Sequence, residues 1–143
     1  MATIKFVDGA HRDFMTFEER VANDPTLAAV LDRVPPENRQ GSTFLHHKGE
    51  NGSPELFEIQ MPPNFKVEAH AHDADEIIVV AEGEICFGKQ VYGVGSSVFI
   101  PKMTLYSFEA GPNGLRFLNF RPTGGSGFIP KDQLLAERGA DSV

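Results

Sequence analysis

The sequence predicts an all-β fold, an antiparallel β-barrel or jelly roll, with a short N-terminal helical segment and a C-terminal helix. From residue 42 to residue 121, short runs rich in β-branched and aromatic residues recur at regular spacing. The segments between them, such as GENGSP, YGVG and GPNG, consist of turn-forming residues. Helix signals occur only near the two ends of the chain. This distribution is typical of β-sandwiches and β-barrels.

The N-terminal part begins with a strand-like piece, TIKFV. The stretch TFEERVANDPTLAAVLDRVPP is predicted to be helical, because Thr16 and Glu19 form a capping box. Asp24 followed by Pro25 can start a second helical turn, and the pair of prolines at the end of the stretch stops the helix.

The β region is expected to form the body of the domain. Its strand candidates are residues 42–48, 55–61, 65–71, 75–81, 84–88, 97–100, 105–109 and 115–121. After the flexible link PTGGSG, the segment PKDQLLAERG predicts a closing helix, with Pro130 at its first position and Gly139 just past its end.

Length and composition predict one domain over residues 1–143, with a barrel core at about 40–121. The chain is 41% hydrophobic and 23% charged, and no apolar run approaches the ~20 residues that a membrane helix needs. The first residues lack the pattern of a secretory signal, so we expect a cytoplasmic protein. Cys86 is the only cysteine, which excludes an internal disulfide and predicts a small buried apolar residue there.

The charge of the chain argues against nucleic acid as a partner. The net charge is -7, and the lysines and arginines are scattered along the sequence instead of clustered. A small molecule is therefore the expected partner.

The stretch EAHAHDADEIIVV contains three potential metal ligands. His70, His72 and Glu76 lie at even spacing, so an extended chain would turn them to the same side. Imidazole nitrogen and carboxylate oxygen bind divalent first-row metals, and a set of three leaves coordination positions open for substrate or oxygen. The stretch is therefore interpreted as half of a metal site.

The spacing of these ligands and of the glycine after them resembles the first motif of the cupin superfamily. His70, one residue, His72, three residues, Glu76, six residues and Gly83 match that motif. The glycine that cupins often carry before the first histidine is Asn64 here.

The second cupin motif matches only in part. Gly95, five residues and Pro101 fit its opening. Met103 stands where glycine is usual, Tyr106 where the last histidine ligand is usual, and Ala110 where the closing asparagine is usual. The resemblance covers roughly residues 40–121.

The resemblance implies a small antiparallel barrel in which the first motif spans two strands joined by a turn. It also implies that His70, His72 and Glu76 point into the barrel at one divalent ion. Fe(II) is preferred for that ion, and Zn, Mn or Ni are alternatives. Cupins usually pair by packing sheets or exchanging N-terminal strands, so a homodimer is expected, with TIKFV as a candidate arm.

Tyr106 is the most informative departure from the family pattern. Its side chain is a phenolate ligand, a hydrogen-bond donor or acid/base, or a residue that fills the barrel. Without a fourth protein ligand, a metal on the other three would keep more open positions, as in mononuclear iron oxygenases.

Further candidates flank the motifs. Asn119 and Arg121 share one face of the last strand and are candidate substrate-binding residues, while the alternative for the arginine is an outward, solvated side chain. His46 and its neighbour His47 face opposite ways, so at most one points inward; His46 is the candidate, and exposure is the alternative. Glu68 is either a solvated residue or the group that orients His70.

These patterns support functions from different classes. The first is an enzyme: preferably an Fe(II) dioxygenase acting on a small oxygen-rich molecule, or alternatively a redox-free metal-dependent lyase, cyclase or isomerase with Tyr106 as acid/base. The second is a small-ligand-binding module, and the third is a structural or storage protein. The intact ligand triad argues against the third, because buried ionisable groups without a role cost desolvation energy.

Overall fold

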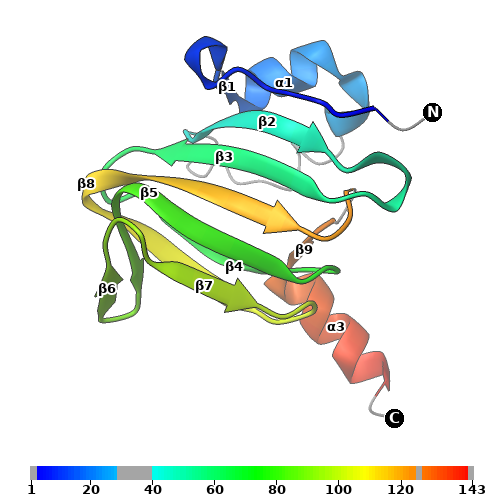
Figure 1. The fold of residues 1–143 in the computed structure, drawn as a ribbon. Coiled ribbons are helices and arrows are strands. Elements are labelled where there is room, and N and C mark those ends of the chain that lie inside the picture. Colours follow the sequence, from blue (N-terminus) through cyan, green and yellow to red (C-terminus); the bar gives the residue numbers. More distant parts are fainter. Residues whose placement is uncertain (1–2, 29–39, 125–126, 142–143) are drawn as a thin grey trace.

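The structure is a computed structural model that describes residues 3–28, 40–124 and 127–141 (Figure 1). Its strands are β1 (Met15–Thr16), β2 (Ser42–Lys48), β3 (Glu55–Met61), β4 (Lys66–His72), β5 (Glu76–Phe87), β6 (Gln90–Tyr92), β7 (Ser97–Ile100), β8 (Tyr106–Arg121) and β9 (Phe128–Pro130). Its α-helices are α1 (Phe17–Asn23) and α3 (Lys131–Asp141), and short 3-10 turns lie at Gly9–His11, Pro25–Leu27 and Glu50–Gly52.

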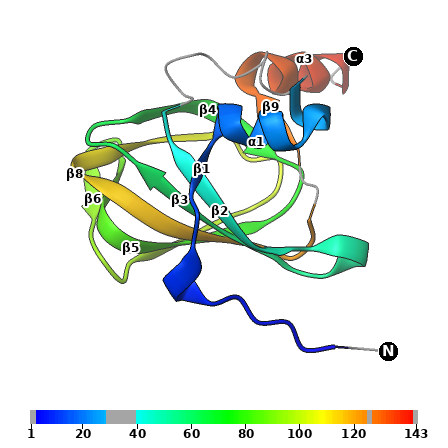
Figure 2. The same cartoon turned by 90° about the horizontal axis from the view of Figure 1, so that it is seen from above.

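Two long strands, β5 and β8, organise the sheet. They pair with each other in antiparallel fashion along most of their length. On the other side of β8, β4 pairs with its first residues, and β3 pairs with residues 115–121. The nine-stranded sheet therefore bends into two layers that share β5 and β8, and Figure 2 shows these layers curving around a common interior.

We call the two layers the front layer and the back layer. The front layer contains β1, β2, β3, the second half of β8, the first half of β5, and β7. The back layer contains β9, β4, the first half of β8, the second half of β5, and β6. The apolar core lies between them and includes Ile78, Val80 and Phe117 of the front layer and Ile85 and Phe108 of the back layer.

Gly83 lies where β5 passes from the front layer to the back layer. Its φ of +71° is left-handed, and a Cβ atom there would lie 2.0 Å from the carbonyl oxygen of Gly114 on β8. Only glycine allows this close approach of the two long strands. The glycine of the first motif therefore has a backbone role.

The predicted all-β architecture is confirmed, with differences in where strands end. The candidates at 42–48, 55–61 and 97–100 match β2, β3 and β7. The candidates at 75–81 and 84–88 form the single strand β5, and those at 105–109 and 115–121 form the single strand β8. The glycines between them produce register shifts within continuous strands instead of turns.

The ends of the chain match the sequence prediction in part. Helix α1 begins as predicted, with Thr16 Oγ1 accepting a hydrogen bond from the Glu19 amide at 3.2 Å. The described residues of TIKFV form no strand, which corrects that expectation. The second half of the predicted N-terminal helix falls within residues 29–39, outside the described residues.

The closing helix is displaced by one residue from its predicted start. Pro130 is the last residue of β9, where it lies opposite His70 of β4, and α3 begins at Lys131. Gly139 lies inside α3 instead of beyond it. Figure 1 shows α3 next to β4 and β9, and α1 beyond β2 on the other side of the molecule. Among the described residues, the helices are too short or too polar to cross a membrane.

Candidate functional site

The predicted site residues gather between the two layers at one end of the interior. His70 and His72 come from β4 of the back layer, and Tyr106 begins β8 in the same layer. Glu76 begins β5 in the front layer, and Asn119 and Arg121 lie near the end of β8. The exposed fraction is 4% for His70, 1% for Glu76, 3% for Asn119 and 9% for Arg121. The structure therefore brings these buried polar groups together from both layers.

Two aspartates hold the turn that joins β4 to β5. Asp73 Oδ1 accepts a hydrogen bond from the Gly127 amide at 3.1 Å, and Asp75 Oδ1 accepts one from the Lys102 amide at 2.8 Å. The acidic residues between the predicted ligands thus fasten the turn to two neighbouring loops. They place His72 and Glu76 on opposite sides of one interior.

His70 is held in one orientation by contacts on three sides. Its Nδ1 donates to the carbonyl oxygen of Glu68 at 2.8 Å, and its ring stacks on Phe128 with centroids 4.6 Å apart. The Tyr106 ring lies 4.5 Å away, centroid to centroid. Burial lowers the pKa of His70, so the ring is neutral at neutral pH. Its Nε2 is then an acceptor, and it makes no hydrogen bond to any residue that the structure describes.

His72 is oriented in the same way and faces a positive charge. Its Nδ1 donates to the carbonyl oxygen of Gly127 at 2.9 Å, and its Nε2 lies 3.4 Å from Nη2 of Arg121. Burial, and then the charge of Arg121, lower the pKa of His72 to about 4. His72 is therefore a neutral acceptor for the guanidinium.

Glu76 is the acceptor at the centre of the cluster. The Tyr106 hydroxyl donates to its Oε1, while Asn119 Nδ2 and Arg121 Nε donate to its Oε2 at 3.1 and 3.3 Å. Burial alone would raise the pKa of Glu76, but these donors and the nearby positive charge hold it below the usual range. Burial, and then the charge of Glu76, raise the pKa of Tyr106, so its hydroxyl keeps its proton.

Arg121 and Asn119 complete the wall on the front layer. The Arg121 guanidinium lies over the Phe57 ring at 4.8 Å from the centroid, a cation–π contact. Asn119 donates its amide hydrogen to Glu76, but its Oδ1 is buried and has no hydrogen-bond partner among the described residues. A buried acceptor without a partner is costly, and it marks a place where a ligand donor would fit.

The donor set fits the expected divalent ion only in part. Both imidazoles suit a metal, since each uses Nδ1 on a backbone carbonyl and leaves Nε2 toward the interior. The carboxylate does not, because three donors already engage Glu76 and the Arg121 cation lies between it and His72. Across residues 3–28, 40–124 and 127–141, no three His, Cys, Asp or Glu side chains are placed to hold a metal. In this arrangement the residues therefore do not fit the ion: the guanidinium supplies the positive charge.

Two departures from the cupin glycines keep the backbone shape that glycine favours. Asn64 has φ of 62° and Met103 has φ of 60°, both left-handed. Asparagine tolerates this conformation, whereas methionine is strained in it. The Met103 amide donates to the His72 carbonyl at 2.7 Å, and its own carbonyl accepts from Arg138 of α3 at 2.8 Å. The strained residue therefore ties the histidine strand to the last helix.

His46 is not part of this cluster. Its Nε2 lies 2.6 Å from Oε1 of Glu58, and Glu58 faces away from the interior because it follows the inward-facing Phe57. His46 has the same parity in β2 as Phe44, which lies opposite Glu58, so His46 lies on this outer face. The structure thus separates His46 from the other predicted site residues.

Sequence analysis missed the segment that closes the site behind the histidines. Phe128, the first residue of β9, stacks on His70, and the carbonyl of the preceding Gly127 accepts from His72. The signal was weak, because they follow a short Gly/Ser-rich link and only their tertiary position gives them a role. For Glu68, it is the backbone carbonyl and not the carboxylate that orients His70.

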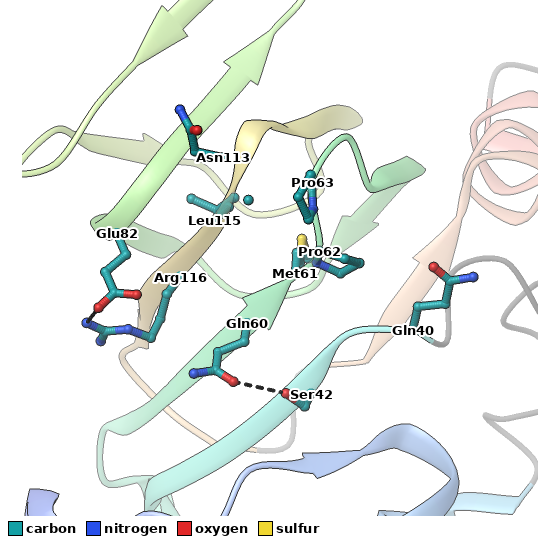
Figure 3. Close-up of a pocket in the computed structure, with 11 residues that line it drawn as sticks. Gln40, Ser42, Gln60, Met61, Pro62, Pro63, Glu82, Asn113, Leu115 and Arg116 are labelled. Carbon is teal, nitrogen blue, oxygen red and sulfur yellow. Dashed lines mark hydrogen bonds and ion pairs between the residues drawn. The ribbon is translucent and has the colours of Figure 1, made fainter.

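A polar hollow of about 390 Å³ lies at the opposite end of β3 and β8 (Figure 3). Its polar side chains already pair with one another. Ser42 donates to Gln60, and Arg116 lies 3.1 Å from Glu82. None of the predicted site residues lines it, so it does not extend the site.

Comparison with known proteins identifies the fold. No family model and no curated protein matches the sequence. Among solved structures, an RmlC-like cupin protein from Ralstonia eutropha covers 98% of this chain and 87% of its own, with a TM-score of 0.66 and 12% identity. The polyketide cyclase RemF from Streptomyces resistomycificus covers 90% of this chain and 86% of its own, with a TM-score of 0.64 and 18% identity.

A third similar structure is the DMSP lyase DddQ from Ruegeria pomeroyi. It covers 71% of this chain and 57% of its own, with a TM-score of 0.58 and 17% identity. At these identities the likeness shows the fold alone. The chain has the cupin fold, and proteins of that fold carry out varied chemistry.

Proposed function

We propose that this chain is an enzyme that binds a small oxygen-rich organic molecule between the two layers and transforms it by proton transfer, without a change of oxidation state. The reaction class is that of a lyase, cyclase or isomerase. One observation carries the proposal: a neutral imidazole with an open Nε2 lies beside a phenol that keeps its proton, with ring centroids of His70 and Tyr106 4.5 Å apart.

The two groups suit opposite halves of a proton transfer. His70 Nε2 is the general base, because its Nδ1 is fixed on the Glu68 carbonyl and its lone pair faces the interior. The Tyr106 hydroxyl has a single hydrogen, which it donates to Glu76 in the structure, so it must release Glu76 to donate to a substrate oxygen. Asn119 and Arg121 then still pair with the Glu76 carboxylate.

The similar structures support this class without deciding it. One is a polyketide cyclase and another is a DMSP lyase. Both names denote reactions of small organic molecules, which agrees with a small molecule as the partner of this chain. Their low identity leaves the substrate open.

The Fe(II) dioxygenase reaction stays a prediction, as do Zn, Mn and Ni as alternative ions. Each requires Glu76 to release Arg121 and Tyr106 before it could bind a metal. Oxygen consumption by protein supplied with Fe(II), measured with an oxygen electrode, would favour this alternative over the proton-transfer reaction.

Deuterium exchange tests the proposal. Uncharged hydroxy ketones, with and without an aryl ring, are incubated with the protein in deuterium oxide, and loss of C–H signal next to the carbonyl is followed by NMR. We expect exchange in at least one compound, and we expect His70→Ala to reduce it by at least about 100-fold. His11→Ala is the matched control, because the His11 side chain is 83% exposed. Exchange that survives His70→Ala would contradict the proposal.

We also propose that the chain forms a homodimer through the outer face of the front layer. Phe99, Ile77 and Phe120 lie side by side there in register across β7, β5 and β8, and they are 61%, 40% and 38% exposed. Adjacent exposed apolar side chains favour a protein partner. Sedimentation equilibrium should give twice the chain mass, and Phe99→Asp should give the monomer.

A further inference from the structure

A cavity of about 360 Å³ lies between β5, β6 and β7, and its lining is mainly apolar but also includes Gln90, Ser96 and Ser97. Its lining includes Ile78 and Val80 of β5 and Val98 of β7. Its other apolar lining residues are Ile85, Phe87 and Tyr92. No charged side chain lines it, so an uncharged, largely apolar group would suit it.

The cavity and the cluster share one wall. Strand pairing places Asn119 opposite Ile78, and Ile78 opposite Val98, so these three residues form one row across β8, β5 and β7. Directly opposed residues in such pairs have Cβ atoms about 5 Å apart. Arg121 lies two residues beyond Asn119 on β8, and it pairs with Glu76, two residues before Ile78 on β5. A molecule that extends from the cavity past Ile78 would therefore meet Asn119 before this ion pair.

The groups that lack partners at this junction are acceptors. Asn119 Oδ1 is buried and unpaired, and His70 Nε2 makes no hydrogen bond to the described residues. An unmade hydrogen bond at a buried acceptor costs about 1–3 kcal/mol. The guanidinium of Arg121 is already balanced by Glu76. The junction therefore calls for a ligand donor and not for a second anion.

We propose that the ligand is an uncharged hydroxyaryl compound whose O–H donates to Asn119 Oδ1 and whose ring occupies the cavity beside Ile78 and Val98. This proposal rests on the proposed function, since it names the class of molecule that the site takes. It assigns Asn119 as a specificity-determining residue and the β5–β6–β7 cavity as the subsite for the apolar part.

Three naphthalene probes test the two features separately. 2-Naphthol carries a donor, 2-methoxynaphthalene has the same ring without a donor, and 2-naphthoate carries a charge. Their fluorescence reports binding directly, because the chain contains no tryptophan. We expect 2-naphthol to bind most tightly. 2-Methoxynaphthalene should bind about 3–10-fold more weakly, the range that one hydrogen bond provides.

Two variants locate the binding. Asn119→Leu removes the acceptor, so the preference for 2-naphthol over 2-methoxynaphthalene should fall to nearly one. Val98→Phe fills the cavity and should weaken all three probes at least about tenfold. Val91→Phe is the matched control, because Val91 is 61% exposed on β6 and does not line the cavity. Methyl NMR of the unaltered protein gives an independent readout, with shifts expected at Ile78, Ile85 and Val98.

Three results would overturn the proposal. The first is that 2-naphthoate binds most tightly, and the second is that the preference for 2-naphthol survives Asn119→Leu. The third is that 2-naphthol leaves the methyl signals of Ile78, Ile85 and Val98 unshifted. The proposed function is judged separately by the loss of deuterium exchange in His70→Ala. Exchange without naphthol binding would therefore reject only the hydroxyaryl ligand.

Discussion

Two buried carboxylates, Glu76 on β5 and Glu58 on β3, face opposite sides of the front layer, and β8 lies between their strands. Each side chain is 1% exposed, and each is paired with arginine and lies near histidine. The types of residue around them would make both carboxylates candidate sites. They differ in whether a nearby hydrogen-bonding atom is left without a partner.

The partners of Glu58 satisfy its carboxylate and close the site around it. Arg12 from the N-terminal segment donates to Oε1, His46 Nε2 lies 2.6 Å from the same oxygen, and Arg116 donates to Oε2 at 2.8 Å. Around Glu76, by contrast, Asn119 Oδ1 has no partner and an apolar cavity begins one strand away. Glu58 therefore fastens a segment, whereas the partners of Glu76 include a side chain whose acceptor atom is left for a ligand.

Removal of Glu58 should give the largest loss of stability among these variants. Glu58→Ala leaves Arg12 and Arg116 without their shared anion, and breaking a buried ion pair costs about 3–5 kcal/mol. Urea denaturation measures the loss. Glu109→Ala, an exposed glutamate on β8, should change the free energy of unfolding by at most about 0.5 kcal/mol. A loss below about 1 kcal/mol for Glu58→Ala would show that the cluster does not hold the segment.

Tyr106→Phe should change the reaction rate more than the stability. It removes the hydroxyl that donates to Glu76 in the structure and to the substrate in the proposed reaction. We expect the deuterium-exchange rate to fall about 100-fold, which is about 2.7 kcal/mol in activation free energy. The free energy of unfolding should fall by only about 1 kcal/mol, because Asn119 and Arg121 still satisfy the carboxylate. An unchanged exchange rate would remove Tyr106 from the mechanism.

Arg121→Met should turn the Glu76 site toward metal binding. Two unit charges about 4 Å apart repel by about 4 kcal/mol at an effective dielectric constant of 20, so losing the guanidinium should raise Co(II) affinity at least about tenfold. Visible absorption of Co(II) reports the coordination. The double variant Arg121→Met with His72→Ala is the control and should lose the gain. Equal Co(II) affinity in the parent chain would show that Arg121 does not replace the ion.

Acid should weaken the Glu58 cluster in a predictable pH range. Burial alone would raise the pKa of Glu58, but His46, Arg116 and Arg12 hold it below the ordinary 4.5. A lowered folded pKa contributes stability that is present above the unfolded pKa and is lost as pH falls through the folded one. Urea midpoints from pH 7 to pH 3 should therefore fall more steeply for the parent than for Glu58→Gln. Parallel curves would contradict this assignment.

Met103→Gly is the smallest expected effect and the only stabilising one. The left-handed conformation destabilises the folded state by about 1–2 kcal/mol for a non-glycine residue. Glycine removes this strain, but its greater freedom in the unfolded chain offsets about 0.5–1 kcal/mol of the gain. We expect a net gain of about 0.5–1 kcal/mol in urea denaturation. Thr104→Gly, at a position without positive φ, should instead destabilise the protein.

Local patterns predicted that these residues gather, because they lie in short, regular segments. The even spacing of His70, His72 and Glu76 places them within one strand–turn–strand unit, and the cupin resemblance brings Tyr106 to the same interior. The same parity rule places Asn119 and Arg121 on one face of β8. These features depend on neighbours in sequence, which a single sequence displays.

Other features depend on contacts between distant segments. The Arg121–Glu76 pair joins residues 45 positions apart, and only the pairing of β5 with β8 brings them together. Gly83 lies between two strand candidates in the sequence, which suggested a turn there. In the structure it lies within β5 and allows the close approach of that strand to Gly114 of β8. Strand β9 escaped detection because three residues after a Gly/Ser-rich link show no period.

The two layers share β5 and β8, and this limits the movements that could admit a ligand. Each of these strands runs without a break through both layers. The two layers therefore cannot move apart unless the backbone of β5 and β8 bends. β6 and β7, by contrast, each pair only with β5 in the described sheet. Movement of β6 or β7 would therefore break only pairing with β5 and would leave the pairing of β5 with β8 intact.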